Sequence, residues 1–147
     1  MVRIALVPLL CLLLSLPALA EKRVALVIGN SVYQHTRELP KPRNDAEAIA
    51  KLLRAHGFVD VTLKNDLDYR AMREAVRLFG EAASAAEIAL IYYGDHGLEV
   101  AGENYLVPTD AQLLREADLE YEAVTLASVL SAVGRAKRLR VVILDAC

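Results

Sequence analysis

Two residues with reactive side chains follow two apolar runs of this sequence. His96 comes shortly after the run at 88–93, IALIYY, and Cys147 comes shortly after the run at 141–144, VVIL. Apolar residues without alternation are typical of a strand that is buried on both faces, as in a parallel sheet covered by helices. Side chains just past the carboxyl ends of such strands lie where open α/β sheets place their chemistry. The sequence therefore predicts a Cys/His pair at one edge of a sheet.

A cysteine beside a histidine pairs a nucleophile with a base. The thiolate is the attacking species, and an ordinary thiol has a pKa of about 8.5, so a neighbouring imidazole takes its proton and later returns it to a leaving amine. The tetrahedral intermediate also needs backbone N–H donors, and we expect Gly97 and Cys147 to supply them. By composition alone, a structural role for a single Cys and a single His is the commoner alternative.

An acid precedes the cysteine by two residues. Asp145 is predicted to lie on the same side of the last strand as Cys147, because side chains alternate along a strand. We therefore expect Asp145 to line a pocket next to the thiol, where its carboxylate favours a basic side chain.

Apolar periodicity predicts the elements that position these residues. Strands are predicted at 23–29, 59–64, 87–93 and 138–147. Helices are predicted at 45–56, at 68–84 and after an N-cap at Thr125. The segment 98–111 has the character of a hairpin around residues 101–104.

Proline and glycine set the expected boundaries of two elements. The segment 31–44 is predicted to be a loop, because Pro40 and Pro42 disfavour regular structure, and Asn44 is the expected N-cap of the helix that follows. The buried run before His96 is expected to stop at Gly94–Asp95, which is a turn signal.

The order of these elements predicts an α/β fold with a mostly parallel sheet and helices on both faces. The chain ends at Cys147, the residue that the chemistry needs. We therefore expect a fragment that stops after the fourth main strand and is not active by itself. A complete protein with a frayed last strand is the alternative.

The first 20 residues have the pattern of a secretory signal peptide. Arg3 is followed by an apolar core at 4–16 and by the small-x-small pattern of Ala18–Ala20. The apolar core is too short for a transmembrane helix, although an uncleaved N-terminal anchor remains an alternative. This predicts a signal peptide at 1–20, a domain at 21–147 and a periplasmic or secreted location.

Charge and cysteine content exclude several partners and cofactors. The formal charge is −2, and it becomes −3 when Arg3 is removed with the signal peptide, so neither nucleic acid nor an anionic membrane is expected as a partner. Cys147 would then be the one remaining thiol, which allows no disulfide within the chain. No residues have zinc-ligand spacing and no dinucleotide fingerprint is present, so we expect no metal and no cofactor.

An ordered set of motifs covers nearly all of residues 23–147. These motifs are ALVIGN at 25–30, NDA at 44–46, YYGDHG at 92–97, GENYLVPTD at 102–110 and VVILDAC at 141–147. Together they resemble the caspase fold family, in particular the bacterial caspase-like and metacaspase branch, over the large-subunit half of the catalytic domain. The resemblance implies a three-layer caspase-like fold.

The resemblance also implies roles for five residues. His96 and Cys147 match the catalytic dyad of the family, and the N–H groups of Gly97 and Cys147 match its oxyanion hole. Metacaspases carry an acid where Asp145 stands and another in the motif that contains Asp45, and they cut after Arg or Lys. Asp45 and Asp145 are thus the expected substrate-binding residues for a basic P1 side chain. For Asp45, an ordinary acid in the first turn of a helix is the alternative.

One departure from the family pattern stands next to the expected histidine. The family usually has a small residue and then Gly before His-Gly, whereas this chain has Gly94–Asp95. Asp95 could hold the imidazole, disturb the loop or face water. A caspase-fold binding or scaffolding module without catalysis is therefore a second hypothesis, and a doubly wound domain for a small ligand is a weaker third one.

The sequence thus predicts a periplasmic or secreted cysteine-type endopeptidase that acts as a monomer. Its partner is a protein or peptide substrate with a basic P1 residue, and after signal cleavage no membrane is involved. C-terminal domains that follow the chain given are compatible with this prediction.

Overall fold

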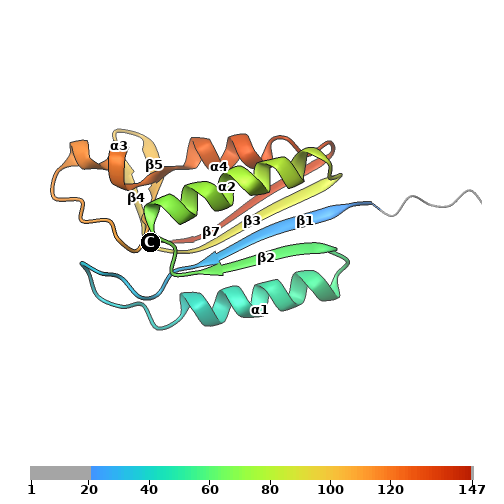
Figure 1. Cartoon of the computed structure of the whole chain (residues 1–147), viewed down its shortest axis with the longest axis horizontal. Coiled ribbons are helices and arrows are strands. Elements are labelled where there is room, and N and C mark those ends of the chain that lie inside the picture. Colours follow the sequence, from blue (N-terminus) through green and yellow to red (C-terminus); the bar gives the residue numbers. More distant parts are fainter. Residues whose placement is uncertain (1–20, 147) are drawn as a thin grey trace, which may run out of the picture.

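The computed structural model describes residues 21–146, so the predicted signal peptide and Cys147 lie outside the described range. The main sheet has four parallel strands in the order β2-β1-β3-β7. These strands are β1 (Arg23–Gly29), β2 (Asp60–Asn65), β3 (Ile88–Asp95) and β7 (Leu139–Ala146). Because they all run in one direction, their carboxyl ends meet at one edge, at the left of Figure 1.

Helices cover both faces of the main sheet (Figure 1). α1 (Pro42–Ala55) packs on one face, and α2 (Tyr69–Ser84) and α4 (Leu126–Val133) pack on the other. The predicted α/β fold, with a parallel sheet between helical layers, is confirmed. Within residues 21–146 no helix combines the length and the apolar character that a membrane crossing requires.

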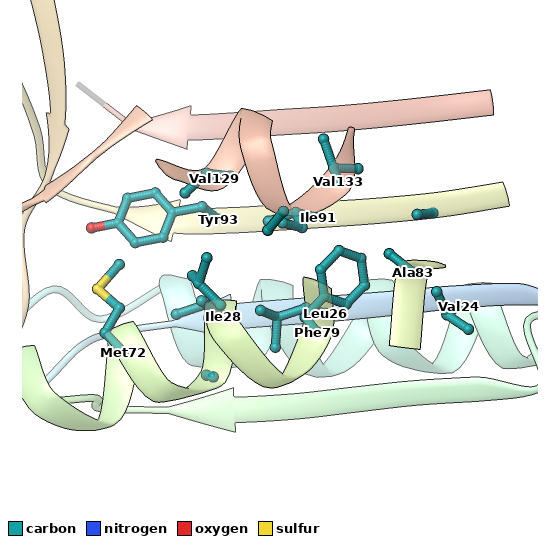
Figure 2. Close-up of a cluster of buried hydrophobic side chains, with 14 of the residues drawn as sticks. Val24, Leu26, Ile28, Met72, Phe79, Ala83, Ile91, Tyr93, Val129 and Val133 are labelled. Atoms are coloured by element: carbon teal, nitrogen blue, oxygen red, sulfur yellow. The ribbon is translucent and has the colours of Figure 1, made fainter. Parts of the chain in front are cut away.

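Both faces of the central strands are apolar, which is why their sequences do not alternate. On β1, the side chains that face α2 and α4 are Val24, Leu26 and Ile28, and those that face α1 are Ala25 and Val27. Figure 2 shows the cluster on the α2/α4 face, where Tyr93 of β3 and Phe79 of α2 are among the buried residues. The hydroxyl of Tyr93 lies at the end of this cluster (Figure 2).

Helix α1 begins earlier than the sequence predicts. It starts at Pro42, so the expected N-cap Asn44 lies inside the helix and part of the predicted loop is wrong. The physical reason is that proline suits the first helical position, where its missing N–H would have no partner in any case. A Cβ at Gly29 would come 2.5 Å from the Pro42 carbonyl oxygen, so the start of α1 packs tightly onto the end of β1.

Strand β3 continues past the predicted stop at Gly94–Asp95. Gly94 pairs with Asp145 and Asp95 pairs with Ala146 of β7, so the two strands remain paired to the end of β3. The turn signal of Gly-Asp is overridden because a neighbouring strand provides pairing partners. His96 is consequently the first residue after the strand.

A second, antiparallel sheet follows, in the order β4-β5-β6. Its strands are β4 (Gly97–Val100), β5 (Glu103–Leu106) and β6 (Val124–Thr125), and the predicted hairpin is confirmed. Thr125 is also the N-cap of α4, as predicted, because its side chain accepts the N–H of Ser128. Three short elements were not predicted, namely the strand β6, the 3-10 helix η2 (Glu116–Asp118) and the helix α3 (Leu119–Glu122). Each is too short to carry a periodic apolar pattern.

Replacing Phe79 by Ala is expected to lower the free energy of unfolding by about 3–5 kcal/mol, because Phe79 fills the core between α2 and the sheet. Chemical denaturation followed by circular dichroism measures this change. Leu78→Ala is the matched control, because Leu78 is 49% exposed on the same helix. An equal loss for both variants would contradict the packing described here.

Candidate active site

Three of the predicted site residues line one cavity at the carboxyl edge of the main sheet. Its volume is about 370 Å³, within the usual range of ligand pockets. The residues that line it are Leu39, Pro40, Lys41, Pro42, Asp45, Gly94, Asp95, His96 and Asp145. Larger cavities of about 440 and 590 Å³ lie against α2, but they contain none of the predicted site residues.

Asp145 reaches the cavity on the α1 face of the sheet. On β7, Val141 packs into the cluster on the α1 face, and Asp145 shares that face because it lies four residues further along the strand. Tyr92 of β3 also faces α1, and its hydroxyl donates a hydrogen bond of 3.0 Å to Asp145 Oδ2. This bond holds one carboxylate oxygen and leaves Asp145 Oδ1 for another partner.

Gly94 provides the room for this contact. A Cβ at Gly94 would lie 2.9 Å from the Tyr92 hydroxyl and 3.1 Å from the edge of its ring. The first half of the unusual Gly94–Asp95 pair therefore has a steric explanation, because a larger residue would displace Tyr92 from Asp145.

Asp45 comes to the same cavity from the first turn of α1. The early start of α1 at Pro42 and its close packing on Gly29 bring this turn to the edge where β3 and β7 end. Asp45 is thus both an acid in a first helical turn and a residue of the cavity, so the geometry accommodates both roles expected from the sequence.

The two acids give the cavity a negative character. Burial raises the pKa of Tyr92 to about 12, and the hydrogen bond and charge of Asp145 and then the charge of Asp45 act in the same direction. Tyr92 therefore remains a hydrogen-bond donor at neutral pH. Within residues 21–146, neither Asp45 nor Asp145 is within salt-bridge distance of a cation. A basic side chain that enters the cavity would meet two acids without a competing ion pair from this range.

His96 is held between β3 and β4 at the rim of the cavity. Its ring packs against Tyr33, with ring centroids 4.9 Å apart and the planes inclined by 59°. Tyr33 comes from the loop after β1 and is buried. Tyr33 was not among the site residues predicted from the sequence. The one available signal was that an aromatic residue stands in an otherwise polar loop.

Asp95 does not face water, which excludes one of the three alternatives that the sequence left open for it. Asp95 is 4% exposed, its carboxyl accepts the backbone N–H of His96, and its Oδ2 lies within hydrogen-bond distance of the Tyr93 hydroxyl, at 3.0 Å. Burial raises the pKa of Asp95 to about 8, against the lowering effects of the His96 N–H and the Asn30 side chain. Asn30 Nδ2 nevertheless makes no hydrogen bond of standard geometry within the described residues, so we assign it only a weak contact.

The end of β7 brings the residue before Cys147 next to Gly97. A Cβ at Gly97 would lie 3.2 Å from the Cβ of Ala146, so the two backbones approach closely there. Cys147 itself lies outside the described residues, and its role as nucleophile, like that of its N–H, stays a prediction. The role of the Gly97 N–H in an oxyanion hole also stays a prediction.

The other two histidines have ordinary structural surroundings. His56 is the C-cap residue of α1, with its Nδ1 atom 2.8 Å from the Leu52 carbonyl oxygen, and His35 lies in the loop after β1 near Gln112. Among the described residues, no group of three or more His, Cys, Asp or Glu side chains is arranged to hold a metal ion.

A known family model covers the whole candidate site. The family model of the caspase domain matches residues 22–147, which include every predicted site residue. This chain belongs to the caspase family. It is therefore a member of a family of cysteine peptidases, and the coarser part of the resemblance inferred from its motifs is confirmed.

Two curated proteins are similar to a part of this caspase domain. The human mucosa-associated lymphoid tissue lymphoma translocation protein 1 is 38% identical over 93 residues, and its mouse homolog is 37% identical over the same length. In both cases the match covers 63% of this chain and 11% of the relative. The chain thus spans about a tenth of the length of these relatives.

Gly94→Ala is expected to lower the free energy of unfolding by about 1–3 kcal/mol, because the added Cβ would overlap the Tyr92 hydroxyl. In a Tyr92→Phe background the same substitution is expected to cost less, since the closest overlapping atom is gone. A double-mutant cycle by chemical denaturation measures this coupling, which we expect to exceed about 0.5 kcal/mol. Additive losses would show that Tyr92 does not lie over Gly94.

Proposed function

We propose that this caspase domain belongs to a cysteine endopeptidase that cleaves peptide bonds after Arg or Lys. The observation that carries the proposal is the cavity that Asp45, His96 and Asp145 line together. These residues come from three elements that are far apart in the sequence, namely α1, the end of β3 and the end of β7. Family membership supports a cysteine peptidase, and the two acids support a basic P1 residue.

In the proposed reaction, Cys147 is the nucleophile and His96 is its base. His96 removes the thiol proton, and the sulfur attacks the carbonyl carbon of the P1 residue. The negative oxygen that forms is stabilised by the N–H groups of Gly97 and Cys147. When the C–N bond breaks, the proton passes from His96 to the leaving amine, and a thioester remains. Water, deprotonated by His96, then hydrolyses the thioester and releases the free thiol.

The proposed specificity depends on the charges at the far side of the cavity. Asp145 offers its Oδ1 to a guanidinium or ammonium group, while the Tyr92 hydroxyl fixes Oδ2. Asp45 adds a second negative charge from α1. The same two positions carry acids in metacaspases, to which the motifs of this chain have a resemblance. On this basis we propose the bacterial caspase-like and metacaspase branch.

The location of the enzyme is part of the proposal. The pattern of residues 1–20 supports export to the periplasm or beyond the cell. An oxidising compartment would require Cys147 to be kept reduced, because the thiolate is the reactive form.

Asp145→Asn in the natural full-length protein is expected to lower kcat/KM for a P1 Arg peptide by about 10- to 100-fold, because a charged hydrogen bond to the substrate is lost. Cleavage of a P1 Gln peptide is expected to change little. Asp45→Asn is expected to have a smaller effect in the same direction, since Asp45 is exposed. Fluorogenic peptides that differ only in the P1 residue measure these ratios.

Asp60→Asn is the matched control for this charge removal, because Asp60 is an exposed acid at the opposite edge of the sheet. It is expected to leave the P1 preference unchanged. A preference for Arg that survives in the Asp45→Asn/Asp145→Asn double variant would contradict the proposed pocket.

A caspase-fold module without catalysis is the second candidate, and the Gly94–Asp95 departure next to His96 favours it. An Arg-containing peptide with a thiol-reactive group distinguishes the two candidates. We expect the folded, reduced natural protein to gain the mass of one such group, and Cys147→Ala to gain none. A folded and reduced protein that stays unlabelled would favour the binding module.

A further inference from the structure

The buried carboxyl of Asp95 forms part of a hydrogen-bond network behind His96. Ile91, Tyr93 and Asp95 follow one another at intervals of two residues on β3, so their side chains lie on the same face of the sheet. This is the face that α2 and α4 cover. Its Oδ1 accepts the N–H of His96, and its Oδ2 lies 3.0 Å from the Tyr93 hydroxyl. In the family pattern that the motifs resemble, glycine usually stands at this position, so the carboxyl of Asp95 is a departure from that pattern.

The Tyr93 hydroxyl is the centre of this network. It lies 2.9 Å from the His96 carbonyl oxygen and 3.2 Å from that of Val107, and it accepts the Val107 N–H over 2.9 Å. One hydroxyl proton therefore faces three oxygens, since the Asp95 carboxyl is the third. A phenol has a single proton to donate, so all three contacts cannot be donated by Tyr93.

A protonated Asp95 resolves this competition. Its Oδ2–H donates to the Tyr93 oxygen, which frees the phenol proton for the His96 carbonyl oxygen. The Val107 carbonyl oxygen then has the Tyr33 hydroxyl as a donor, 3.4 Å away. Asp95, Tyr93 and the carbonyl oxygens of His96 and Val107 each have a partner in this arrangement, whereas a carboxylate would draw the Tyr93 proton away from His96.

We propose that Asp95, as a neutral acid, is a positioning residue that acts with Tyr93 to fix the backbone of His96 on both sides. The N–H of His96 is held by Asp95, and its carbonyl oxygen is held by Tyr93 and by the Val107 N–H over 3.2 Å. With the backbone fixed and the ring packed on Tyr33, the imidazole has a defined direction at the rim of the cavity. The importance of this direction for catalysis rests on the proposed function.

The burial of both groups agrees with neutral forms at pH 7. Burial raises the pKa of Asp95 to about 8 and raises that of Tyr93 well above its usual range. The titratable groups that face Asp95 directly are Tyr93 and His96, and Tyr33 lies behind the His96 ring. Across the cavity the charged groups are Lys41, Asp45 and Asp145. The raised pKa of Asp95 is due to its burial, against the lowering effects of the His96 N–H and the Asn30 side chain.

The ionisation of Asp95 gives stability a defined pH dependence. Because its pKa is higher in the folded protein, the folded state keeps a proton that the unfolded chain releases from about pH 4 upwards. The stabilising contribution is therefore complete below about pH 4 and is lost as the pH rises through about 8.

The test compares Asp95→Asn with Asp95→Ala in the natural full-length protein. Asparagine resembles the neutral acid, since its oxygen can accept the His96 N–H and its amide can donate to Tyr93. We expect Asp95→Asn to keep kcat within about twofold and Asp95→Ala to lower kcat about 10- to 100-fold with little change in KM. Between pH 5 and 9, the melting temperature of the natural protein should fall relative to that of Asp95→Asn.

A readout that needs no peptidase activity separates this inference from the proposed function. In NMR spectra of protein labelled in its histidines, the His96 ring is expected to give one signal in the natural protein and in Asp95→Asn, and a shifted or multiple signal in Asp95→Ala. If Asp95→Ala does not fold, Tyr93→Phe replaces it, because this variant removes the donor to the His96 carbonyl. An unchanged His96 signal in Asp95→Ala, or in Tyr93→Phe where Asp95→Ala does not fold, would overturn the inference. This holds whether or not the protein cleaves peptides.

Discussion

The parallel pairing of β3 with β7 is the constraint on which the candidate site depends. The register places Gly94 beside Asp145 and Asp95 beside Ala146, so both strands end at the same level. His96 follows one strand, and Cys147 follows the other in the sequence. Two segments about fifty residues apart are thereby brought together by backbone hydrogen bonds, and a shift of one residue in this register would turn Asp145 to the opposite face of the sheet.

Helix α1 completes the site from the side of the sheet that lacks α2 and α4. Its early start and its tight packing on Gly29 fix the position of Asp45 relative to the ends of β3 and β7. The cavity thus depends on contacts among backbone segments more than on long flexible side chains. The loop before α1 contributes Leu39, Pro40 and Lys41 to its lining.

Much of the fold could be predicted because buried parallel strands have a distinct apolar pattern. The strand order along the chain, the hairpin and the cap at Thr125 all followed from local signals. The start of α1 and the end of β3 were wrong because local proline and glycine signals were overridden by tertiary contacts, namely helix packing on Gly29 and pairing with β7.

The candidate site could also be predicted only in part, because some of its contacts are tertiary contacts without a local signal in the sequence. The motifs pointed to Asp45, His96 and Asp145, and these residues do share a cavity. Tyr33 and the Tyr93–Asp95 contact escaped prediction, because burial and hydrogen-bond partners depend on chain segments that no local pattern relates.

Tyr92 and Tyr93 are neighbours in the sequence but serve opposite faces of the sheet. Tyr92 supports the acid of the cavity on the α1 side, and Tyr93 supports the backbone of His96 on the α2/α4 side. The sheet therefore separates the part of the molecule that we propose to select a side chain from the part that holds the histidine. Under the proposed function, mutations on the α1 side could change which residue is recognised while the contacts of Tyr93 persist, so that selectivity could change without a change in the support of the proposed base.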